Sequence, residues 1–282
     1  MEDAKDAVDM ADMAMWAARL LAAARGQPFA SGGWRRMRDL SVLPLTPEVS
    51  LVFACDATGG IGPKPHDTYV TDGYTLGRFA ARVPLAELLA CGATPILIAD
   101  LLSVEREPTG AAIIAGVRDE AQAAGLDPAS ISGSTEGNVP TLATGVGIAV
   151  LALVAGERFR PGCGQAGDLV VCIGVPKSAP AHRIVLDDPE ILDLPALRRV
   201  LALDAVGDVL PVGSRGLLAE AHDLAASAGL HFVPAPAPSL DLAQSGGPAT
   251  CCLFTLALAA LPALRALPLP PLAVIGTLAA GD

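Results

Sequence analysis

The chain has 282 residues, 52% of them hydrophobic and 17% charged, with a formal net charge of −11. This length and composition allow a sizeable core, in one large domain or two smaller ones, and argue against intrinsic disorder. The acidic balance argues against a nucleic-acid partner and against binding to an anionic membrane surface. Nucleotides are not excluded as ligands, because magnesium and backbone N–H groups supply the positive field that phosphates need.

Three further features of the composition bear on location. The six cysteines form no C-x-x-C pair and five of them lie in apolar runs, which is typical of buried, reduced thiols in a cytoplasmic protein and disfavours a zinc site. Residues 1–12 hold five acids and one lysine, so they do not resemble a signal peptide. Four prolines and Arg265 interrupt the most apolar stretch, residues 253–272, and no membrane span is expected there.

The first half of the chain predicts an alternation of strands and helices. Residues 2–25 have helical spacing and, with a linker at 26–33, would form an N-terminal helical extension. Two strands at 38–45 and 51–56 favour a hairpin, although parallel pairing is not excluded. Pro84 should kink or restart the helix expected over 75–91. The elements expected next are a strand at 96–104, a helix at 111–125, a polar loop at 131–138 and a strand at 144–155.

The second half also mixes helices and strands. Residues 156–167 are rich in glycine and mark a natural boundary. We expect strands at 168–174, 230–233, 249–258 and 272–278, and helices at 189–203 and 216–228. The fold class is therefore α/β of the α+β kind, with helices on one sheet face of the first half. The predicted divisions are an extension over 1–33, a domain over 34–155 and a second domain over 156–282.

Carboxylates recur at the ends or in the interiors of apolar elements. Asp56 ends a strand and precedes the glycine turn at 58–62, Asp100 and Glu105 lie toward the end of another strand, and Glu87 is the lone acid of an apolar helix. A buried carboxylate is costly unless a metal, a charge or several donors compensate it. The pattern favours a metal-linked anion site. Ordinary strand-end acids and the polar side of a helix remain the alternatives.

Two polar loops carry further candidate residues. Lys64, His66 and Asp67 follow the glycine turn, although a lone histidine in a loop is more often simply solvated. Glu136 and Asn138, in a short glycine-bearing loop, are candidates for binding metal or sugar hydroxyls. The sequence has no P-loop, no G-x-S-x-G elbow and no H-E-x-x-H motif.

Several of these segments together resemble the aminoimidazole ribonucleotide (AIR) synthetase superfamily. Residues 77–95, GRFAARVPLAELLACGATP, resemble a helix and Gly-Ala turn shared by thiamine-monophosphate kinase, selenophosphate synthetase and a hydrogenase maturation protein. Pro84 and Glu87 stand where many members have Asn and Asp. Residues 54–56 resemble the strand-end metal acid, residues 132–136 the G-G-[DE]-T loop, and residues 212–220 a segment of the second domain, without its Asp. The altered pattern, including LSVEREPTG at 102–110 and GPATC at 247–251, resembles the α-ribazole kinase branch.

The resemblance implies a two-domain AIR synthetase-like (PurM-like) fold that forms a homodimer, with the N-terminal sheets paired into a barrel. ATP with Mg²⁺ would lie in a cleft beside that interface. It implies metal or phosphate-side roles for Asp56, Asp100 and Glu136, with Glu87 in support. The other nucleotide-binding residues it implies are Gly59, Gly60, Gly62, Ser134, Thr135 and Asn138. Lys64 and His66 would approach the phosphates or substrate, and Asp67 is the candidate to orient or deprotonate the accepting hydroxyl.

The activity implied is phosphoryl transfer from ATP to the ribose 5′-hydroxyl of α-ribazole, in salvage of the lower ligand of cobalamin. Such chemistry depends on positioning and charge neutralisation more than on covalent catalysis. Two alternatives stay open: a thiamine-monophosphate kinase-like or AIR synthetase-like ATP-dependent enzyme, and a non-catalytic nucleotide-binding relative.

Overall fold

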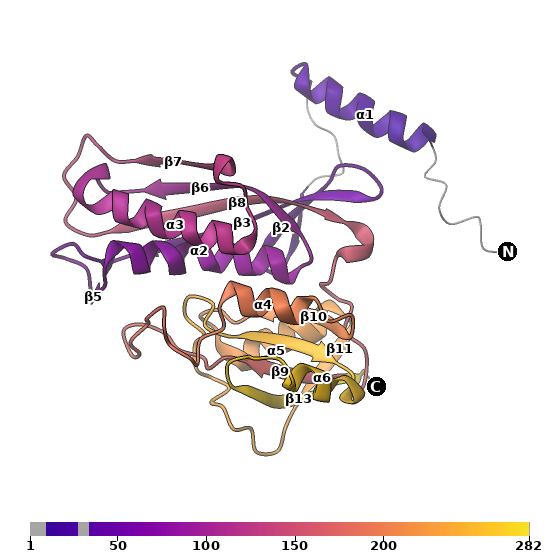
Figure 1. Ribbon diagram of the computed structural model, residues 1–282. Coiled ribbons are helices and arrows are strands. Elements are labelled where there is room, and N and C mark those ends of the chain that lie inside the picture. The colour runs from indigo at the N-terminus through magenta and orange to yellow at the C-terminus, as the bar shows by residue number, and fades with distance from the viewer. Residues whose placement is uncertain (1–9, 28–33, 282) are drawn as a thin grey trace.

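The computed structural model describes residues 10–27 and 34–281, and it contains two main β-sheets (Figure 1). We call the elements up to β8 the first half and those from β9 onward the second half. The helix predicted over 2–25 is α1 (Met10–Ala24), which lies apart from both sheets in the view of Figure 1. The rest of that prediction, residues 2–9, lies outside the described residues, as does most of the predicted linker. None of the described helices is long and apolar enough to cross a membrane.

The first sheet has six strands in the order β1-β2-β3-β8-β6-β7. Their bounds are β1 (Arg35–Met37), β2 (Leu40–Pro44), β3 (Val49–Gly59), β8 (Gly145–Ala155), β6 (Thr94–Leu102) and β7 (Ile131–Thr135). β2 and β3 pair antiparallel, which confirms the predicted hairpin. The segment at 131–138 is not only a loop, as predicted. Its first five residues form β7, because they pair in parallel with β6.

Alternation of side chains along β3 decides which residues meet the helices. Val52 and Ala54 are buried, whereas Cys55 on the opposite face is exposed. Successive side chains of a strand point to opposite faces, so Asp56 shares the buried face of Val52 and Ala54. The helices α2 (Gly73–Ala90) and α3 (Ala111–Ala124) cover this face (Figure 1). The strand therefore delivers a carboxylate to the helix-covered side of the sheet.

The helix α2 is continuous through Pro84, so the predicted restart does not occur there, and the predicted kink stays a prediction. Asp72 caps its first turn by accepting a hydrogen bond from the Thr75 N–H. Pro84 is itself buried, and the surrounding core holds the helix together despite the missing N–H. α2 also lies very close to α3. A Cβ on Gly77 would come within 2.1 Å of the Ile113 carbonyl oxygen. Glycine there is required by packing.

The second sheet has five strands in the order β10-β12-β9-β13-β11. Their bounds are β9 (Leu169–Ile173), β10 (Val206–Pro211), β11 (Leu230–Pro234), β12 (Cys252–Leu256) and β13 (Leu272–Ala280). The helices of this half are α4 (Leu194–Leu201), α5 (Gly216–Ser227) and α6 (Leu261–Arg265). The sequence did not predict β10 or α6, and α4 is shorter than expected because Asp193 caps it with a bond to the Ala196 N–H. A two-stranded ribbon, β4 (Ile61–Gly62) with β5 (Tyr69–Val70), completes the strands.

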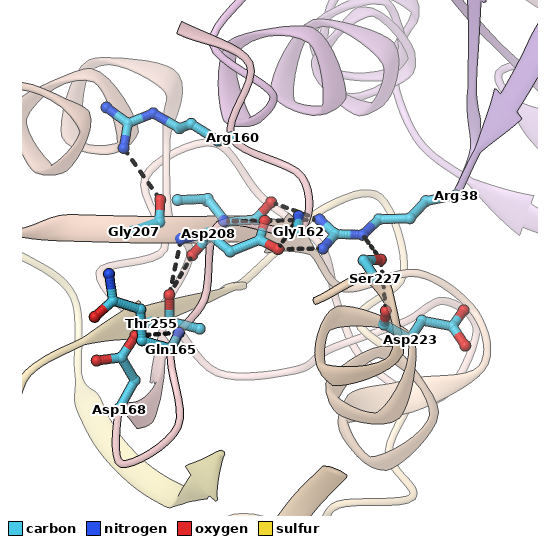
Figure 2. Close-up of polar contacts among 11 residues, drawn as sticks. Arg38, Arg160, Gly162, Gln165, Asp168, Gly207, Asp208, Asp223, Ser227 and Thr255 are labelled. Carbon is cyan, nitrogen blue, oxygen red and sulfur yellow. Dashed lines mark hydrogen bonds and ion pairs between the residues drawn. The ribbon is translucent and has the colours of Figure 1, made fainter. Parts of the chain in front are cut away.

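The two halves share one continuous apolar core. Buried residues of the first sheet and α2 belong to the same cluster as Val171, Val209 and Phe254 of the second sheet. One buried ion pair adds to this contact. Arg38, in the turn after β1, reaches into the second half and pairs with Asp208 of β10 (Figure 2). The apolar core and this ion pair thus connect the two halves.

Candidate functional site

A cavity of about 540 Å³ lies between the two halves. The first half contributes the end of β3, the glycine turn after it and one face of α2. The second half contributes the end of β10 with residues 212–214 and two loops, at 178–184 and 245–249. The cavity is therefore built by segments far apart in the sequence.

Three carboxylates from three elements line this cavity. Asp56 comes from β3, Glu87 from α2 and Asp39 from the turn between β1 and β2. Burial raises the pKa of Asp56, and the nearby Asp39 raises it further. Burial likewise raises the pKa of Glu87 well above its usual range, and Asp39 and Glu220 add to this effect. The charged forms of these acids are therefore disfavoured in the free protein, and a bound cation would compensate them.

Asp39 is a cavity residue that was not predicted from the sequence. Arg38, immediately before it, has a φ of 55°, a left-handed conformation that non-glycine residues rarely adopt. Its side chain is held in the second half, while Asp39 lines the cavity. The one signal in the sequence was the Arg-Asp-Leu triplet, which carries no periodicity that would place Asp39 near Asp56.

The glycine turn lies beside the acids and has the geometry that glycine permits. Gly59 lines the cavity, and Gly60 has a φ of +69°. At Gly62, whose φ is +150°, a Cβ would come within 2.5 Å of the Thr144 Oγ1 atom. A side chain at Gly62 would collide with Thr144, so only glycine lets the backbone pass this close to it.

Asp67 holds this turn together from inside. Its carboxylate accepts hydrogen bonds from the Lys64 N–H at 2.8 Å, the Thr144 N–H at 2.7 Å and the Thr144 hydroxyl at 2.6 Å. The residue is 9% exposed and does not line the cavity. His66, next to it, is exposed. In this conformation Asp67 is engaged with its own loop, and its predicted role as a base stays a prediction.

A second cavity, of about 320 Å³, lies next to Lys64 of this loop and residues 136–141. Lys64 lines it and donates from Nζ to the Glu105 carboxylate at 2.6 Å and to the Thr141 carbonyl at 2.9 Å. The bond from Lys64, with one from Thr109, lowers the pKa of Glu105 to about 2. Glu136 and Asn138 also line this cavity. Glu136 accepts from the Asn138 N–H at 2.6 Å, which lowers its pKa, so it organises its own turn.

The remaining predicted residues lie on β6 and β7. Asp100 is 2% exposed, and burial raises its pKa although Arg106 and Arg118 oppose the shift. A Cβ on Gly133 of β7 would come within 2.0 Å of the Asp100 Oδ1 atom, so this glycine makes room for the acid. Ser134 and Thr135 continue β7 beyond it and line neither cavity.

The structure does not gather the three predicted metal acids into one preformed ion site. Asp56 opens into the larger cavity, Glu136 lines the smaller one and Asp100 is covered by the sheet edge. Within residues 10–27 and 34–281, no three His, Cys, Asp or Glu side chains are arranged to hold a metal ion.

Comparisons with known proteins bear on this arrangement. Residues 37–154 match the family described as AIR synthase related protein, N-terminal domain. A search of curated proteins by sequence gave no match.

Solved structures resemble the chain over most of its length. Thiamine-monophosphate kinase from Stenotrophomonas maltophilia K279a is 20% identical, with a TM-score of 0.57 over 98% of this chain and 95% of that one. AaThiL complexed with AMPPCP and TMP is 15% identical, with a TM-score of 0.57 over 94% and 90%. PurLQS from Thermotoga maritima is 15% identical, with a TM-score of 0.63 over 96% of this chain and 45% of that one. The matched N-terminal domain and these likenesses confirm the predicted superfamily resemblance and its mixed α/β fold.

Proposed function

We propose that this AIR synthase-related chain is an ATP-dependent small-molecule kinase that uses Mg²⁺ and transfers the terminal phosphoryl group of ATP to a ribose hydroxyl. The acceptor that we propose is α-ribazole, and the product is its 5′-phosphate. The matched N-terminal domain supports an enzyme of this superfamily. The similarity to AaThiL, which is complexed with the ATP analogue AMPPCP and with TMP, supports ATP as the donor.

One observation carries the proposal: a cavity of about 540 Å³ between the halves has three carboxylates and a glycine turn on its polar side. Phosphoryl transfer needs its two substrates held in line and the phosphate charge neutralised. Asp39, Asp56 and Glu87 supply oxygen ligands of the kind that Mg²⁺ prefers. The turn at Gly59 and Gly60 offers backbone close to an anion without a side chain in the way.

The carboxylates of Asp39, Asp56 and Glu87 fit a magnesium ion that enters the cavity together with a nucleotide. Mg²⁺ usually keeps several waters and is bound by one or two carboxylates plus phosphate oxygens. An all-protein cage is therefore not required, in keeping with the absence of a three-acid cluster from the described part of the chain. Asp56 and Glu87 would hold the ion, and Asp39 would complete the negative field. When bound, magnesium supplies charge neutralisation on the phosphates.

The chain's own residues would divide the remaining work. Lys64 is engaged with Glu105 and Thr141, so in the proposed enzyme it would fix the loop at the second cavity. Asp67 would keep the glycine turn in shape through its three bonds. The acceptor hydroxyl would lie at the acidic side of the cavity, where a carboxylate not engaged with the ion would take its proton.

A homodimer through the first sheet belongs to the same proposal. The face of that sheet away from the helices exposes large apolar side chains, among them Ile96 at 43%, Leu101 at 52% and Leu153 at 36%. Apolar strand faces of this kind are typically covered by a partner. Sedimentation velocity tests this, because a charged substitution such as Leu101→Glu should shift a dimer to monomer.

The test of function is release of ADP from Mg-ATP by the purified protein, with α-ribazole and thiamine monophosphate as separate acceptors. Release that requires α-ribazole supports the proposal. Release only with thiamine monophosphate would establish the thiamine-monophosphate kinase-like alternative. Binding of ATP without release under either condition would identify a non-catalytic nucleotide-binding relative or another acceptor.

A further inference from the structure

The side chains that α2 contributes to the wall of the large cavity differ in polarity along the helix. Thr75, Leu76, Phe79, Val83 and Glu87 all line the cavity from one face of this helix. Phe79 and Glu87 are eight residues apart, which corresponds to about 12 Å along the helix axis at 1.5 Å per residue. The wall along α2 is therefore apolar over Leu76, Phe79 and Val83 and acidic at Glu87, on a single rigid element.

Residues from two other segments complete the apolar end. Ile184, in the loop after β9, packs with Phe79 in a small buried cluster, and Tyr69 of β5 lines the same cavity. The Tyr69 hydroxyl accepts a hydrogen bond from the Ile184 N–H at 2.9 Å. This bond ties the loop of the second half to the ribbon of the first half. The apolar wall is therefore already assembled in the free protein.

The Phe79 ring is held in place from behind. The Arg82 guanidinium lies 4.5 Å from the ring centroid and donates to the Glu120 carboxylate at 2.7 Å. Arg82 is 2% exposed, Glu120 is 0% exposed and neither lines the cavity. The pair thus fixes the ring without presenting a charge to the ligand.

The charges that line this cavity are all of one sign. It has three carboxylates, and no Lys, Arg or His side chain of the described residues contributes to its lining. A phosphate ester bound here by protein groups alone would meet repulsion, whereas a neutral ring with a hydroxyl-bearing end would not. A flat apolar ring fits the end formed by Phe79, Tyr69 and Ile184.

We infer that Phe79, with Ile184 and Tyr69, forms the subsite that recognises the ring of the acceptor, and that this subsite takes an uncharged aromatic nucleoside in preference to its phosphate ester. The inference rests on the proposed function for the identity of the acceptor. With the ring against Phe79, the ribose extends along α2 toward Asp56 and Glu87. The 5′-hydroxyl then lies on the side where the donor phosphates would be neutralised.

The decisive measurement is calorimetric titration of the full chain with benzimidazole, the ring type that α-ribazole carries, in the absence of nucleotide and metal. The wild-type protein should bind the ring, and Phe79→Leu should weaken binding about tenfold. Phe232→Leu is the matched control, because Phe232 is also 5% exposed but lies in the core of the second sheet. No ring binding by the wild type, or an equal loss in both variants, overturns the subsite.

A second titration tests the charge argument on the wild-type protein and stays informative even if Phe79→Leu does not fold. With a chelator present, α-ribazole should bind at least tenfold more tightly than α-ribazole 5′-phosphate. Equal or tighter binding of the phosphate ester overturns the preference. Ring binding that depends on Phe79, found together with no ADP release, would leave the subsite standing and overturn the kinase proposal alone.

Discussion

The guanidinium of Arg38 makes a two-pronged ion pair with the carboxylate of Asp208, across the boundary between the two halves of the chain (Figure 2). The Arg38 and Asp208 side chains are 6% and 0% exposed. Asp208 also accepts from the Gly162 N–H at 2.8 Å and the Val209 N–H at 2.8 Å, and Arg38 donates from Nε to the Ser227 hydroxyl at 3.0 Å. The carboxylate is thus fully compensated, which is the condition under which a buried ion pair is tolerated.

Breaking this pair from one side should strongly destabilise the protein. Arg38→Met leaves Asp208 charged and buried, and we expect a loss of about 3–5 kcal/mol in the free energy of unfolding. Asp223→Asn is the control, because the Asp223 side chain is 42% exposed and pairs with the 55% exposed Arg215, and such pairs contribute about 0–1 kcal/mol. Urea denaturation followed by circular dichroism measures both. A loss for Arg38→Met no larger than that of the control would contradict the role of the pair.

Replacing Asp67 should damage the glycine turn, whereas replacing His66 should not. Asp67→Ala removes the acceptor of three hydrogen bonds and leaves the buried Thr144 N–H without its partner, at a cost of about 2–4 kcal/mol. His66→Ala changes an exposed side chain and should stay within about 0.5 kcal/mol of wild type. Thermal unfolding of both variants provides the comparison. Unchanged stability in Asp67→Ala would contradict this structural role.

Much of the fold was predictable because hydrophobic patterning decides it locally. The apolar run of β3 and the helical spacing of α3 are visible in the sequence, and both elements form there, although β3 extends beyond the predicted 51–56. The pattern failed where tertiary contacts decide. β7 is a polar segment made into a strand by backbone pairing with β6, and α2 continues through Pro84 because its surroundings are buried.

The site was less predictable, because it is assembled across the chain. Asp56 and Glu87 were recognised as acids in apolar elements, and both line the large cavity. Asp39 was missed because its position depends on the left-handed turn at Arg38 and on the pairing of Arg38 with Asp208, 170 residues away in the chain. The loop that carries Ile184 has no signal of its own, since its part in the cavity depends on contact with α2.

Glu87 should make stability depend on pH. Its pKa is raised on folding because the side chain is desolvated and lies near Asp39 and Glu220. A carboxyl whose folded pKa is raised contributes stability that is fully present below its unfolded pKa of about 4.5 and is lost as pH rises through the folded value. Glu87→Gln should therefore be more stable than wild type at pH 8, by about 1.4 kcal/mol for each unit of the shift, and equal to it near pH 4.

Thermal unfolding across this range checks the prediction, and Glu136→Gln is its control. The pKa of Glu136 is lowered, because it accepts bonds from backbone N–H groups, and its side chain lies in an exposed loop. Its removal should not stabilise the protein at pH 8. A stability gain for Glu87→Gln that persists unchanged at pH 4 would mean that packing, and not ionisation, is responsible.

Asp56 should be required for binding of Mg-ATP but not for binding of ATP without the metal. Asp56→Asn keeps the shape of the side chain and removes one negative charge from the cavity. The loss of about 1.4 kcal/mol or more of attraction to a divalent cation would weaken Mg-ATP binding roughly tenfold or more. ATP with a chelator should bind the variant at least as well as it binds wild type, because a repulsive charge is gone. Asp127→Asn, at an exposed turn cap, serves as the control. Titration calorimetry with and without magnesium gives both affinities, and an equal loss under the two conditions would show that Asp56 does not act through the metal.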